Sequence, residues 1–485
     1  MKEKESRNMK MNKVEKSTVM YRALNEEQCR EIAAAAIRIL GRTGCVIQNE
    51  KAVALLKEAG CVTQGDHVWI PETLIRWALD AAPESITLYN RDGEPAMRAE
   101  PGEFNFGPVT STCDIIDIKT GERRKSVKKD LEEAAVLMDS LENLAWASDC
   151  LTLSDVNPAY CDITEVSVLL QNTRKPFWYY AQNIDNLKIQ FEMFETVAGG
   201  EDKLRLHPFT VNLICPLDAL RHSDNGMEQI MYCAEKGAPV VYIPGTEFGL
   251  TSPATMAGTI AAGIADCLPA LVVSQLTAKG APFIAACFRN NVDFSTMALD
   301  HSRPEMIAAN IATADVWRYL GLPFCCNMAN TDNGDFGPQA VFEKTAQYYS
   351  VMLAGINMCY GVGCYEAGMV LRYADWMFSN EVIEYLKRLV CGFSINEETL
   401  AENLIDEVGP GGVYLMEEHT MEHIHDFWVP QLLKSRKMGK GAALEQDLAD
   451  AAAEIIAKGP QNELDAAKKA AIAAIMSRVE AEYSK

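Results

Sequence analysis

The sequence predicts an α/β protein, a (β/α)8 barrel of the TIM type with an N-terminal helical extension and a C-terminal helical tail. Two observations lead to this prediction. Short apolar runs, loops rich in Gly, Pro and Asn, and helical segments follow one another eight times over about 290 residues, which favours a closed barrel over an open sheet. The apolar runs are continuous, as is typical of parallel strands that are covered by helices.

Residues 1–102 are predicted to form the helical extension and a β-rich lead-in. The segment 1–20 has a charged start but lacks the apolar stretch of a secretory signal, so we expect a loose arm. Three helices should follow, over residues 26–40 with Asn25 as N-cap, 51–59, and 71–82 with Pro71 at the first helical position. Residues 86–118 then change to short β-rich pieces, and a hairpin is expected around Lys119, Thr120 and Gly121.

Residues 103–435 are predicted to form the barrel. The expected strands are 104–107, 144–148, 176–181, 209–212, 240–244, 283–288, 324–327 and 358–361. The expected helices begin near Ser126, Tyr160, Asp185, Ser223, Thr255, Pro304, Asp335 and Ser379. Several of these starting residues are Ser, Thr or Asp, which are preferred helix N-caps.

Residues 436–485 are predicted to be a helical tail. Two segments with helical periodicity, ALEQDLADAAAEIIA and ELDAAKKAAIAAIMSRVEA, are separated by Gly459 and Pro460. Surface helices of this kind pack either on their own barrel or on a second subunit, and a homo-oligomer is expected.

Composition argues against several partners and compartments. The chain has 485 residues, and 45 Lys and Arg against 67 Asp and Glu give a net charge of −22, which repels nucleic acid and anionic membranes. The longest apolar stretch, 260–275, contains Asp266 and Pro269 and is shorter than the roughly 20 residues that span a bilayer. Fifteen scattered cysteines indicate reduced thiols in a cytoplasm.

Aromatic residues gather where the predicted strands end, which is where barrel enzymes carry their chemistry. They are Phe106 after strand 1, Phe177 to Tyr180 through strand 3, Tyr242 and Phe248 around strand 5, Phe336 after strand 7, and Tyr360 and Tyr365 after strand 8. In strand 3 either Phe177 and Tyr179 or Trp178 and Tyr180 point into the barrel, because side chains alternate. Each ring alone is compatible with core packing, but together they suit a box around a quaternary ammonium, where a ring face contributes about 0.5 to 2 kcal/mol.

Three charged residues are candidates for substrate contacts. Arg289, just past strand 6, could hold a substrate carboxylate in a bidentate pair, or form an ion pair with Asp293 or Asp300. Asp332 and Glu366 could offset a cation or hold a hydroxyl, or simply cap their loops.

Cysteine and histidine clusters raise a zinc alternative. Cys325 and Cys326 near the end of strand 7, with Cys287 and Cys359 nearby, would suit a zinc-thiolate methyltransferase, but adjacent strand residues face opposite ways. The histidines His419, His423 and His425 lie among acidic residues without an H-E-x-x-H pattern, so a structural or subunit-contact role is expected. We therefore expect no tightly bound metal. Gly361 and Gly363 form a G-x-G without a third glycine, which argues against a dinucleotide site.

Over residues 25–436 the sequence resembles the trimethylamine methyltransferase superfamily, in its branch without pyrrolysine. The resemblance rests on AAAAIRILGRTGCVI, FNFGPVTSTCDIIDIKTGERRKSVKKDLEEAAVLMDSLEN, RKPFWYY, TDNGDFGPQAVFEK and GPGGVYLMEEHTMEHIHDFWVPQLLKSR. It implies a (β/α)8 barrel and a substrate:corrinoid methyltransferase that works with a separate protein carrying the corrinoid (cobalamin-type) cofactor. Relatives that demethylate trimethylamine carry pyrrolysine in the loop after strand 7, whereas residues 332–339 here are ordinary amino acids.

The resemblance therefore implies a quaternary amine substrate, such as glycine betaine, proline betaine, carnitine or γ-butyrobetaine. Such a substrate loses a methyl group to Co(I) by SN2 attack and leaves as a neutral tertiary amine, so no general acid is required. The protein would orient the substrate and exclude water. On this hypothesis Phe106, Tyr179, Phe248, Phe336 and either Tyr360 or Tyr365 surround the ammonium, and Arg289 holds the carboxylate. A zinc-thiolate methyltransferase and a non-catalytic betaine-binding barrel remain as alternatives.

Overall fold

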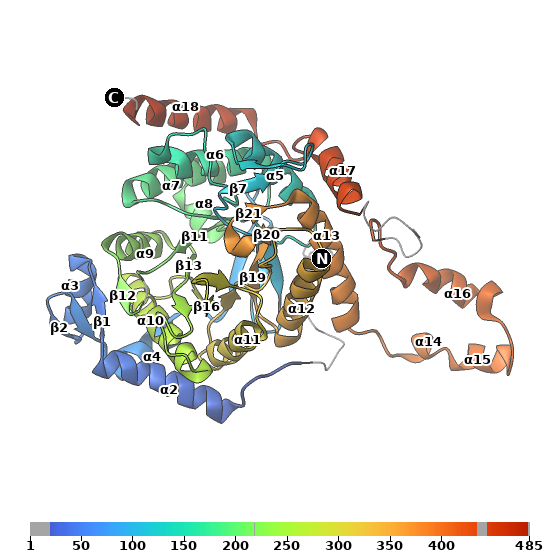
Figure 1. Ribbon diagram of the computed structural model, residues 1–485, viewed down its shortest axis with the longest axis horizontal. Coiled ribbons are helices and arrows are strands. Elements are labelled where there is room, and N and C mark those ends of the chain that lie inside the picture. Colours follow the sequence, from blue (N-terminus) through green and yellow to red (C-terminus); the bar gives the residue numbers. More distant parts are fainter. Residues whose placement is uncertain (1–19, 218, 434–443, 484–485) are drawn as a thin grey trace.

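The computed structural model describes residues 20–217, 219–433 and 444–483, and its centre is an eight-stranded parallel barrel (Figure 1). The strands are β6 (Asn105–Pro108), β9 (Ala147–Ser148), β10 (Phe177–Tyr179), β11 (Thr210–Ile214), β13 (Val240–Tyr242), β15 (Phe283–Ala286), β18 (Phe324–Cys326) and β19 (Met358–Val362). The spatial order is β6-β19-β18-β15-β13-β11-β10-β9, and the first and last strands approach each other where Ala145 N–H donates to the Phe106 carbonyl at 2.8 Å. The predicted barrel and all eight strands are confirmed.

Side chains of each barrel strand alternate between the interior and the surrounding helices. Trp178, Val211, Val241, Ile284 and Cys325 belong to one interior cluster. Their sequence neighbours, such as Phe177, Tyr179 and Cys326, belong to the cluster that includes the helices. The alternation fixes which predicted site residues face the barrel interior.

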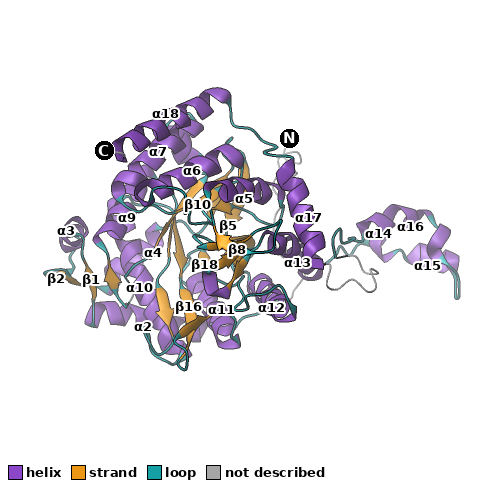
Figure 2. Ribbon diagram, turned by 45° about the horizontal axis from the view of Figure 1, so that its top comes forward, coloured by secondary structure: helices purple, strands orange, loops and turns teal. Residues whose placement is uncertain are grey.

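Eight helices surround the barrel (Figure 2). They are α5 (Lys128–Ser140), α6 (Cys161–Asn172), α7 (Ile184–Ala198), α9 (Asp224–Lys236), α10 (Met256–Thr277), α11 (Pro304–Tyr319), α12 (Pro338–Ala354) and α13 (Tyr373–Val390). Seven begin within three residues of the predicted starts. Helix α13 begins earlier than predicted, and Ser379 lies inside it, where its hydroxyl donates to Asp375 at 3.1 Å.

The apolar segment predicted to be too short for a membrane span belongs to helix α10, which is long and apolar enough to cross a membrane by length and composition. The helix is longer than predicted because Pro269 lies inside it without ending it. In the protein, 78% of its most apolar window is buried, so α10 serves as a core helix.

The N-terminal extension packs beside and beneath the barrel. Helix α2 (Glu26–Arg42) begins with the capping box of Asn25 and Gln28, and α3 (Glu50–Glu58) and α4 (Glu72–Ala81) follow. The prediction that Pro71 is the first helical residue of α4 is wrong. Pro71 is the N-cap, because its ψ of 147° is extended. Strands β1 (Cys45–Ile47), β2 (Val62–Gln64) and β3 (His67–Trp69) form a sheet with β12 (Arg221–His222). The hairpin of β4 (Ile86–Tyr89) and β5 (Pro95–Ala99) contributes Ile86, Leu88, Met97 and Ala99 to the interior cluster.

Two small sheets rise from the loops that follow the barrel strands. One joins β7 (Asp114–Ile116), β8 (Arg123–Lys125), β20 (Cys364–Tyr365) and β21 (Val370–Leu371), and the predicted hairpin at residues 119–121 is its β7–β8 turn. The other joins β14 (Gly245–Glu247), β16 (Phe288–Asp293) and β17 (Ala298–Asp300). Together these sheets flank the C-terminal mouth of the barrel.

The chain ends in two helices, as predicted, and both pack on their own barrel. Helix α17 (Leu444–Ala457) contacts α13 and α5, and α18 (Ala466–Tyr483) contacts α7 and α6. The Tyr483 hydroxyl donates to Asn186 at 2.9 Å. Part of the predicted tail, residues 436–443, lies outside the described residues.

Residues 391–430, which the sequence prediction included in the barrel, instead leave the body as an arm (Figures 1 and 2). The arm contains α14 (Glu397–Leu400), α15 (Glu402–Val408) and α16 (Glu418–His423). These short helices follow the eighth βα unit, so they have no barrel strand to cover.

Candidate functional site

Three aromatic rings form a layer across the barrel interior. Trp146 stacks on Trp178 with ring centroids 5.1 Å apart, and Trp178 contacts Tyr360 at 5.4 Å. All three side chains are buried. Gly107 on β6 is required beside them, because a Cβ there would lie 1.9 Å from the Trp146 ring. These rings make the floor of any pocket that opens at the barrel mouth.

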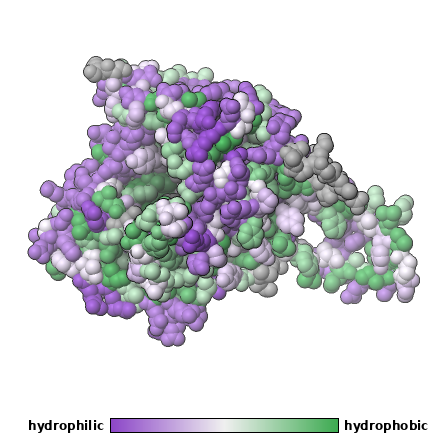
Figure 3. Space-filling model, viewed as in Figure 1, coloured by the Kyte–Doolittle hydropathy of each residue, from purple (hydrophilic) through white to green (hydrophobic). Residues whose placement is uncertain are grey.

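One level above this floor lies a second set of inward positions. Tyr180, Cys215 and Asn327 each follow, by two residues, the interior residues Trp178, Leu213 and Cys325. Tyr180 is 42% exposed and Cys215 is exposed, whereas Asn327 is nearly buried. The surface is hollowed over the region where Figure 1 labels β11 and β13 (Figure 3). An aromatic floor with a partly open upper level is therefore the candidate site.

Carboxamides line the side of this site at the ends of β18 and β19. Asn330 donates to Oδ1 of Asn327 and is itself fixed by Gln347, whose Nε2 donates to the Asn330 carbonyl at 2.9 Å. A Cβ on Gly361 would lie 2.4 Å from Asn330 Oδ1, so only glycine permits this contact. Oδ1 of Asn327 is thus the acceptor of this pair, and Nδ2 is the donor group of the same carboxamide.

Two buried carboxyl groups lie behind the rim of the site. Asp149 follows β9, and its Oδ2 accepts from the Tyr180 backbone N–H at 2.9 Å. Burial raises the pKa of Glu165 on α6 to about 8, and burial followed by the nearby Glu165 charge raises the pKa of Asp149 well above its ordinary value. The carboxylate of Asp149 thus fixes the position of Tyr180 through its backbone N–H, and Glu165 lies near Asp149 in the same buried region.

The structure does not bring Phe106 and Tyr179 to the interior. Phe106 packs edge-on against Tyr348 of α12 at 5.3 Å, and Tyr179 packs against Phe194 of α7 at 4.9 Å. Both point toward the surrounding helices, because side chains alternate along a strand and the residues next to them point into the barrel. The prediction that they surround the substrate is wrong.

Of the two strand-8 tyrosines, Tyr360 faces the interior and Tyr365 does not. The Tyr365 hydroxyl donates to Asp375 at 2.9 Å, and Nζ of Lys344 lies 3.9 Å from its ring centroid. Lys344 in turn forms a buried ion pair with Asp375 at 2.8 Å. The ring of Tyr365 thus already binds a cation, which belongs to the protein itself.

Phe336 and Phe248 lie farther from the floor. Phe336 is half-buried against Phe378 of α13 at 5.4 Å, and it packs on the cluster of Tyr365 and Val370 outside the barrel. Phe248 is half-buried after β14, and its backbone N–H donates to the Asn290 carbonyl at 3.1 Å. Phe248 therefore stays at the rim, whereas Phe336 does not reach the site.

The predicted charged residues are only partly placed. Arg289 lies on β16 opposite Thr246 of β14, and its side chain is outside the described residues. Asp332 accepts the His301 backbone N–H at 2.9 Å, and burial raises the pKa of Asp332 to about 6. Glu366 accepts from Arg123 at 2.8 Å. Asp332 and Glu366 thus act as loop-holding groups, the alternative considered for both.

The thiols divide between two layers, as the alternation of β18 predicts. Cys325 faces the interior, whereas Cys326 and Cys359 face the helices. Cys287 lies 3.5 Å from the Thr246 hydroxyl. Among the residues that the structure describes, no group of three or more His, Cys, Asp or Glu is arranged to hold a metal ion. His423 instead bonds Glu398 and Asp426 within the arm, each at 2.7 Å.

Sequence reasoning missed much of this site. Trp146 precedes a two-residue strand and was not singled out, and Trp178 was one of two possible choices in strand 3. Asn327 and Asn330 stand in a loop where amides are common. If the sequence had shown which residues of β10 and β18 face inward, the alternation of side chains would have identified Trp178 and Asn327.

The chain is similar in sequence to several known proteins. The family model described as trimethylamine methyltransferase (MTTB) matches residues 1–484. The trimethylamine methyltransferase MttB of Desulfitobacterium hafniense (strain DSM 10664 / DCB-2) is 30% identical over 405 residues, covering 82% of this chain and 81% of its own. The glycine betaine methyltransferase of Desulfitobacterium hafniense (strain Y51) is 25% identical over 415 residues, covering 85% and 86%.

Among solved structures, the monomethylamine methyltransferase (MtmB) of Methanosarcina barkeri matches with a TM-score of 0.49 and 10% identity, covering 91% of this chain and 89% of that one. The family model extends over nearly the whole sequence, and the relatives align over most of their own length. The chain therefore belongs to the trimethylamine methyltransferase family, and it is a methyltransferase.

Proposed function

We propose that this methyltransferase moves a methyl group from a quaternary amine to the Co(I) of a separate corrinoid protein. The observation that carries the proposal is the aromatic layer of Trp146, Trp178 and Tyr360 beneath a partly open mouth. Aromatic faces attract quaternary ammonium groups, and a ring contributes about 0.5 to 2 kcal/mol. The relative named as a glycine betaine methyltransferase supports the same substrate class.

The residues of the mouth suit a betaine in one orientation. The ammonium would lie over Tyr360, with Tyr180 at its side, so that one N-methyl group faces the opening. Nδ2 of Asn327 would donate to the substrate carboxylate, since its Oδ1 already accepts from Asn330. Arg289 and Phe248 remain proposed contacts on the opposite rim, and Tyr179, Phe106, Phe336 and Tyr365 are removed from the proposal.

The proposed reaction needs no further catalytic group from the protein. The corrinoid supplies the nucleophile as a second substrate, and the amine leaves neutral, so no side chain must deliver a proton. The protein binds and orients the substrate and keeps water from the methyl carbon. A very tight cation box would oppose the reaction, because the positive charge on nitrogen fades toward the transition state.

A panel of quaternary amines with free Co(I) cobalamin tests the proposal. We expect the absorbance change of methyl-Co(III) formation with at least one betaine, and none with trimethylamine as the negative control. Activity should persist after dialysis against a chelator, which distinguishes the reaction from zinc-thiolate catalysis. Methyl transfer from trimethylamine alone, or substrate-induced thermal stabilisation without any methyl transfer, would overturn the proposal.

A further inference from the structure

The arm formed by residues 391–430 buries none of its own side chains. All forty positions are described, and each is either exposed or only partly buried. Twelve large apolar side chains are more than one-third exposed: Phe393, Ile395, Leu400, Ile405, Val413, Tyr414, Leu415, Met416, Met421, Ile424, Phe427 and Val429. So many exposed apolar side chains on one segment indicate an interaction site.

Both ends of the arm are fixed to the body at α13. The arm leaves at Cys391, the C-cap of that helix, and returns where the Glu381 carboxylate accepts the backbone N–H groups of Leu432 and Leu433 at 2.6 and 2.7 Å. Tyr385 of α13 and Trp428 also touch, with ring centroids 6.2 Å apart. The arm is thus a held projection with an unpaired apolar surface, and it requires a partner to cover it.

The charge of the arm restricts what that partner can be. Residues 391–430 contain nine Asp and Glu and no Lys or Arg. A surface that receives this arm must therefore combine apolar contacts with positive charge.

Such a surface exists on the far side of the same chain, between α2 and α10. It is a groove of about 850 Å³ whose floor includes Ala35, Ile39, Ala257 and Ala261. Arg30, Arg38 and Arg76 border it together with Glu31, and Arg30 and Arg76 form exposed ion pairs with Glu27 and Glu72 of their own helices. Small residues on the floor allow a helix to approach closely, and exposed pairs of this kind are weak enough to be exchanged for the acidic side chains of the arm.

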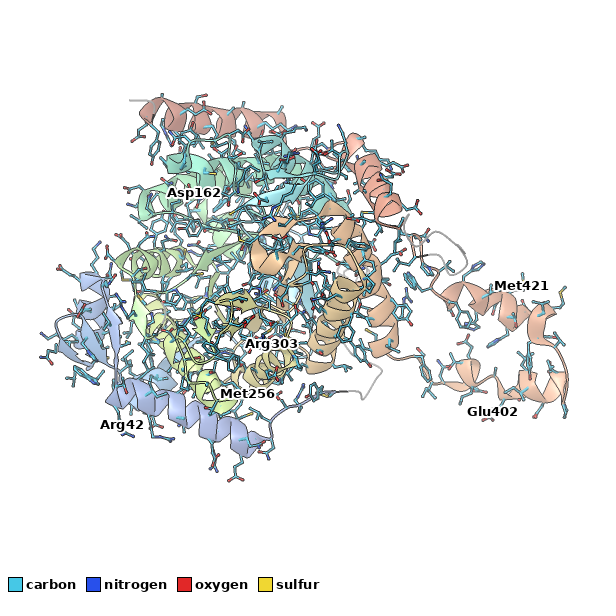
Figure 4. The ribbon with its side chains drawn as sticks, in the orientation of Figure 1. Arg42, Asp162, Met256, Arg303, Glu402 and Met421 are labelled. Atoms are coloured by element: carbon cyan, nitrogen blue, oxygen red, sulfur yellow. The ribbon has the colours of Figure 1, made fainter. Side chains whose placement is uncertain are left out.

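The arm cannot fill the groove of its own chain. In Figure 4, Glu402 and Met421 on the arm lie at one side of the molecule, whereas Arg42 and Met256 mark α2 and α10 on the other. The C-terminal helices, the other expected contact surface, already pack on their own barrel. We propose that the arm of one copy docks in the α2–α10 groove of a second copy. This is a heterologous contact, of the kind that builds closed rings when the rotation closes.

Two variants test the arm and the groove one at a time. Met416→Asp places a charge on the arm at a side chain that is 85% exposed, and Ala257→Glu places one in the groove. Leu206→Asp is the matched control, since Leu206 is 68% exposed on α8 (Glu201–Leu206), away from both surfaces. Circular dichroism and thermal melting should show that all three variants fold.

Light scattering after size exclusion then gives the mass of each protein. We expect the natural chain and Leu206→Asp to form an oligomer, and Met416→Asp and Ala257→Glu each to run near the 53.5 kDa of one chain. Mixing the last two should yield a one-to-one dimer, because one supplies an intact groove and the other an intact arm. A monomeric natural chain, an oligomer that survives either variant, or a mixture that stays monomeric would overturn the proposal.

Discussion

At the scale of single residues, the two tyrosines at the end of strand 8 have different roles because their surroundings differ. Tyr360 contacts Trp178 in the interior, whereas Tyr365 is bonded to Asp375 and covered by Lys344. The first presents its ring to the barrel interior, and the second stabilises the packing of β20 on α13. Sequence could name both tyrosines but not choose between them.

Replacing Tyr360 should therefore weaken substrate binding. We expect Tyr360→Leu to lower kcat/KM for the quaternary amine by roughly 2- to 30-fold, the equivalent of about 0.5 to 2 kcal/mol per ring face, mainly through a higher KM. Tyr360→Phe keeps the ring and should retain most of the activity. Steady-state kinetics with free Co(I) cobalamin measures both, and an unchanged KM in Tyr360→Leu would contradict the assignment.

Tyr365→Phe should lower stability and leave substrate binding unchanged. It removes a buried hydrogen bond to Asp375, which should lower the free energy of unfolding by about 1 to 3 kcal/mol. KM for the amine should not change, because the ring faces Lys344 and not the mouth. Urea unfolding and kinetics on one preparation test the two expectations together.

The buried Glu165 should make stability depend on pH. Burial raises its pKa from 4.5 to about 8, so between these values the unfolded chain releases a proton that the folded chain keeps. Stability contributed by the protonated form is thus lost as pH rises through this window, at up to about 1.4 kcal/mol per pH unit. Glu165→Gln should flatten the curve of unfolding free energy between pH 5.5 and 8.5. Parallel curves for the two proteins would show that the group does not titrate in this way.

At the scale of elements, sequence periodicity predicted the strands and helices better than the direction of their side chains. Continuous apolar runs gave all eight barrel strands, because parallel strands are buried on both faces. The same continuity removes the alternation that would reveal the inner face, so Phe106 and Tyr179 were assigned to the wrong layer. The arm was missed for a related reason: its apolar residues resemble those of a core, but the chain places them outside.

One element-scale prediction concerns the contact between β6 and the tryptophan floor. A Cβ at Gly107 would lie 1.9 Å from the Trp146 ring, so Gly107→Ala must displace that ring or the strand. We expect a loss of about 1 to 3 kcal/mol in the free energy of unfolding and a raised KM, since Trp146 supports Trp178.

Gly337→Ala is the matched control, because nothing lies within 4 Å of its Cβ position and its φ of −149° suits any residue. Its KM should equal that of the natural protein, and its free energy of unfolding should fall by no more than about 1 kcal/mol, because Gly337 is the N-cap of α12 and alanine is a poorer N-cap than glycine. If Gly107→Ala left KM unchanged and lowered the free energy of unfolding no more than Gly337→Ala, the Trp146 ring would not be packed against Gly107 as closely as the 1.9 Å distance indicates.

At the scale of the whole molecule, exposed apolar side chains gather in two separate places. The arm lies beyond the eighth βα unit, whereas a second set of exposed apolar side chains surrounds the barrel mouth. These rim residues are Leu217, Leu250, Phe294, Met297 and Met369, and all stand in loops that follow barrel strands. On the proposed function, cobalt would approach the methyl carbon through this mouth, so we expect a corrinoid protein to dock at the rim.

Docking and chemistry can be separated by changing only the rim. Phe294 is 64% exposed at the β16–β17 turn, so Phe294→Asp should remove apolar contact with a protein partner without touching the aromatic floor. We expect methyl transfer to the corrinoid protein to fall about tenfold or more, as for a residue central to an interface. Transfer to free Co(I) cobalamin should be unchanged, and Leu206→Asp should be silent in both assays. An equal loss with both acceptors would place Phe294 in substrate binding, and no loss with either would leave the rim without a role in docking.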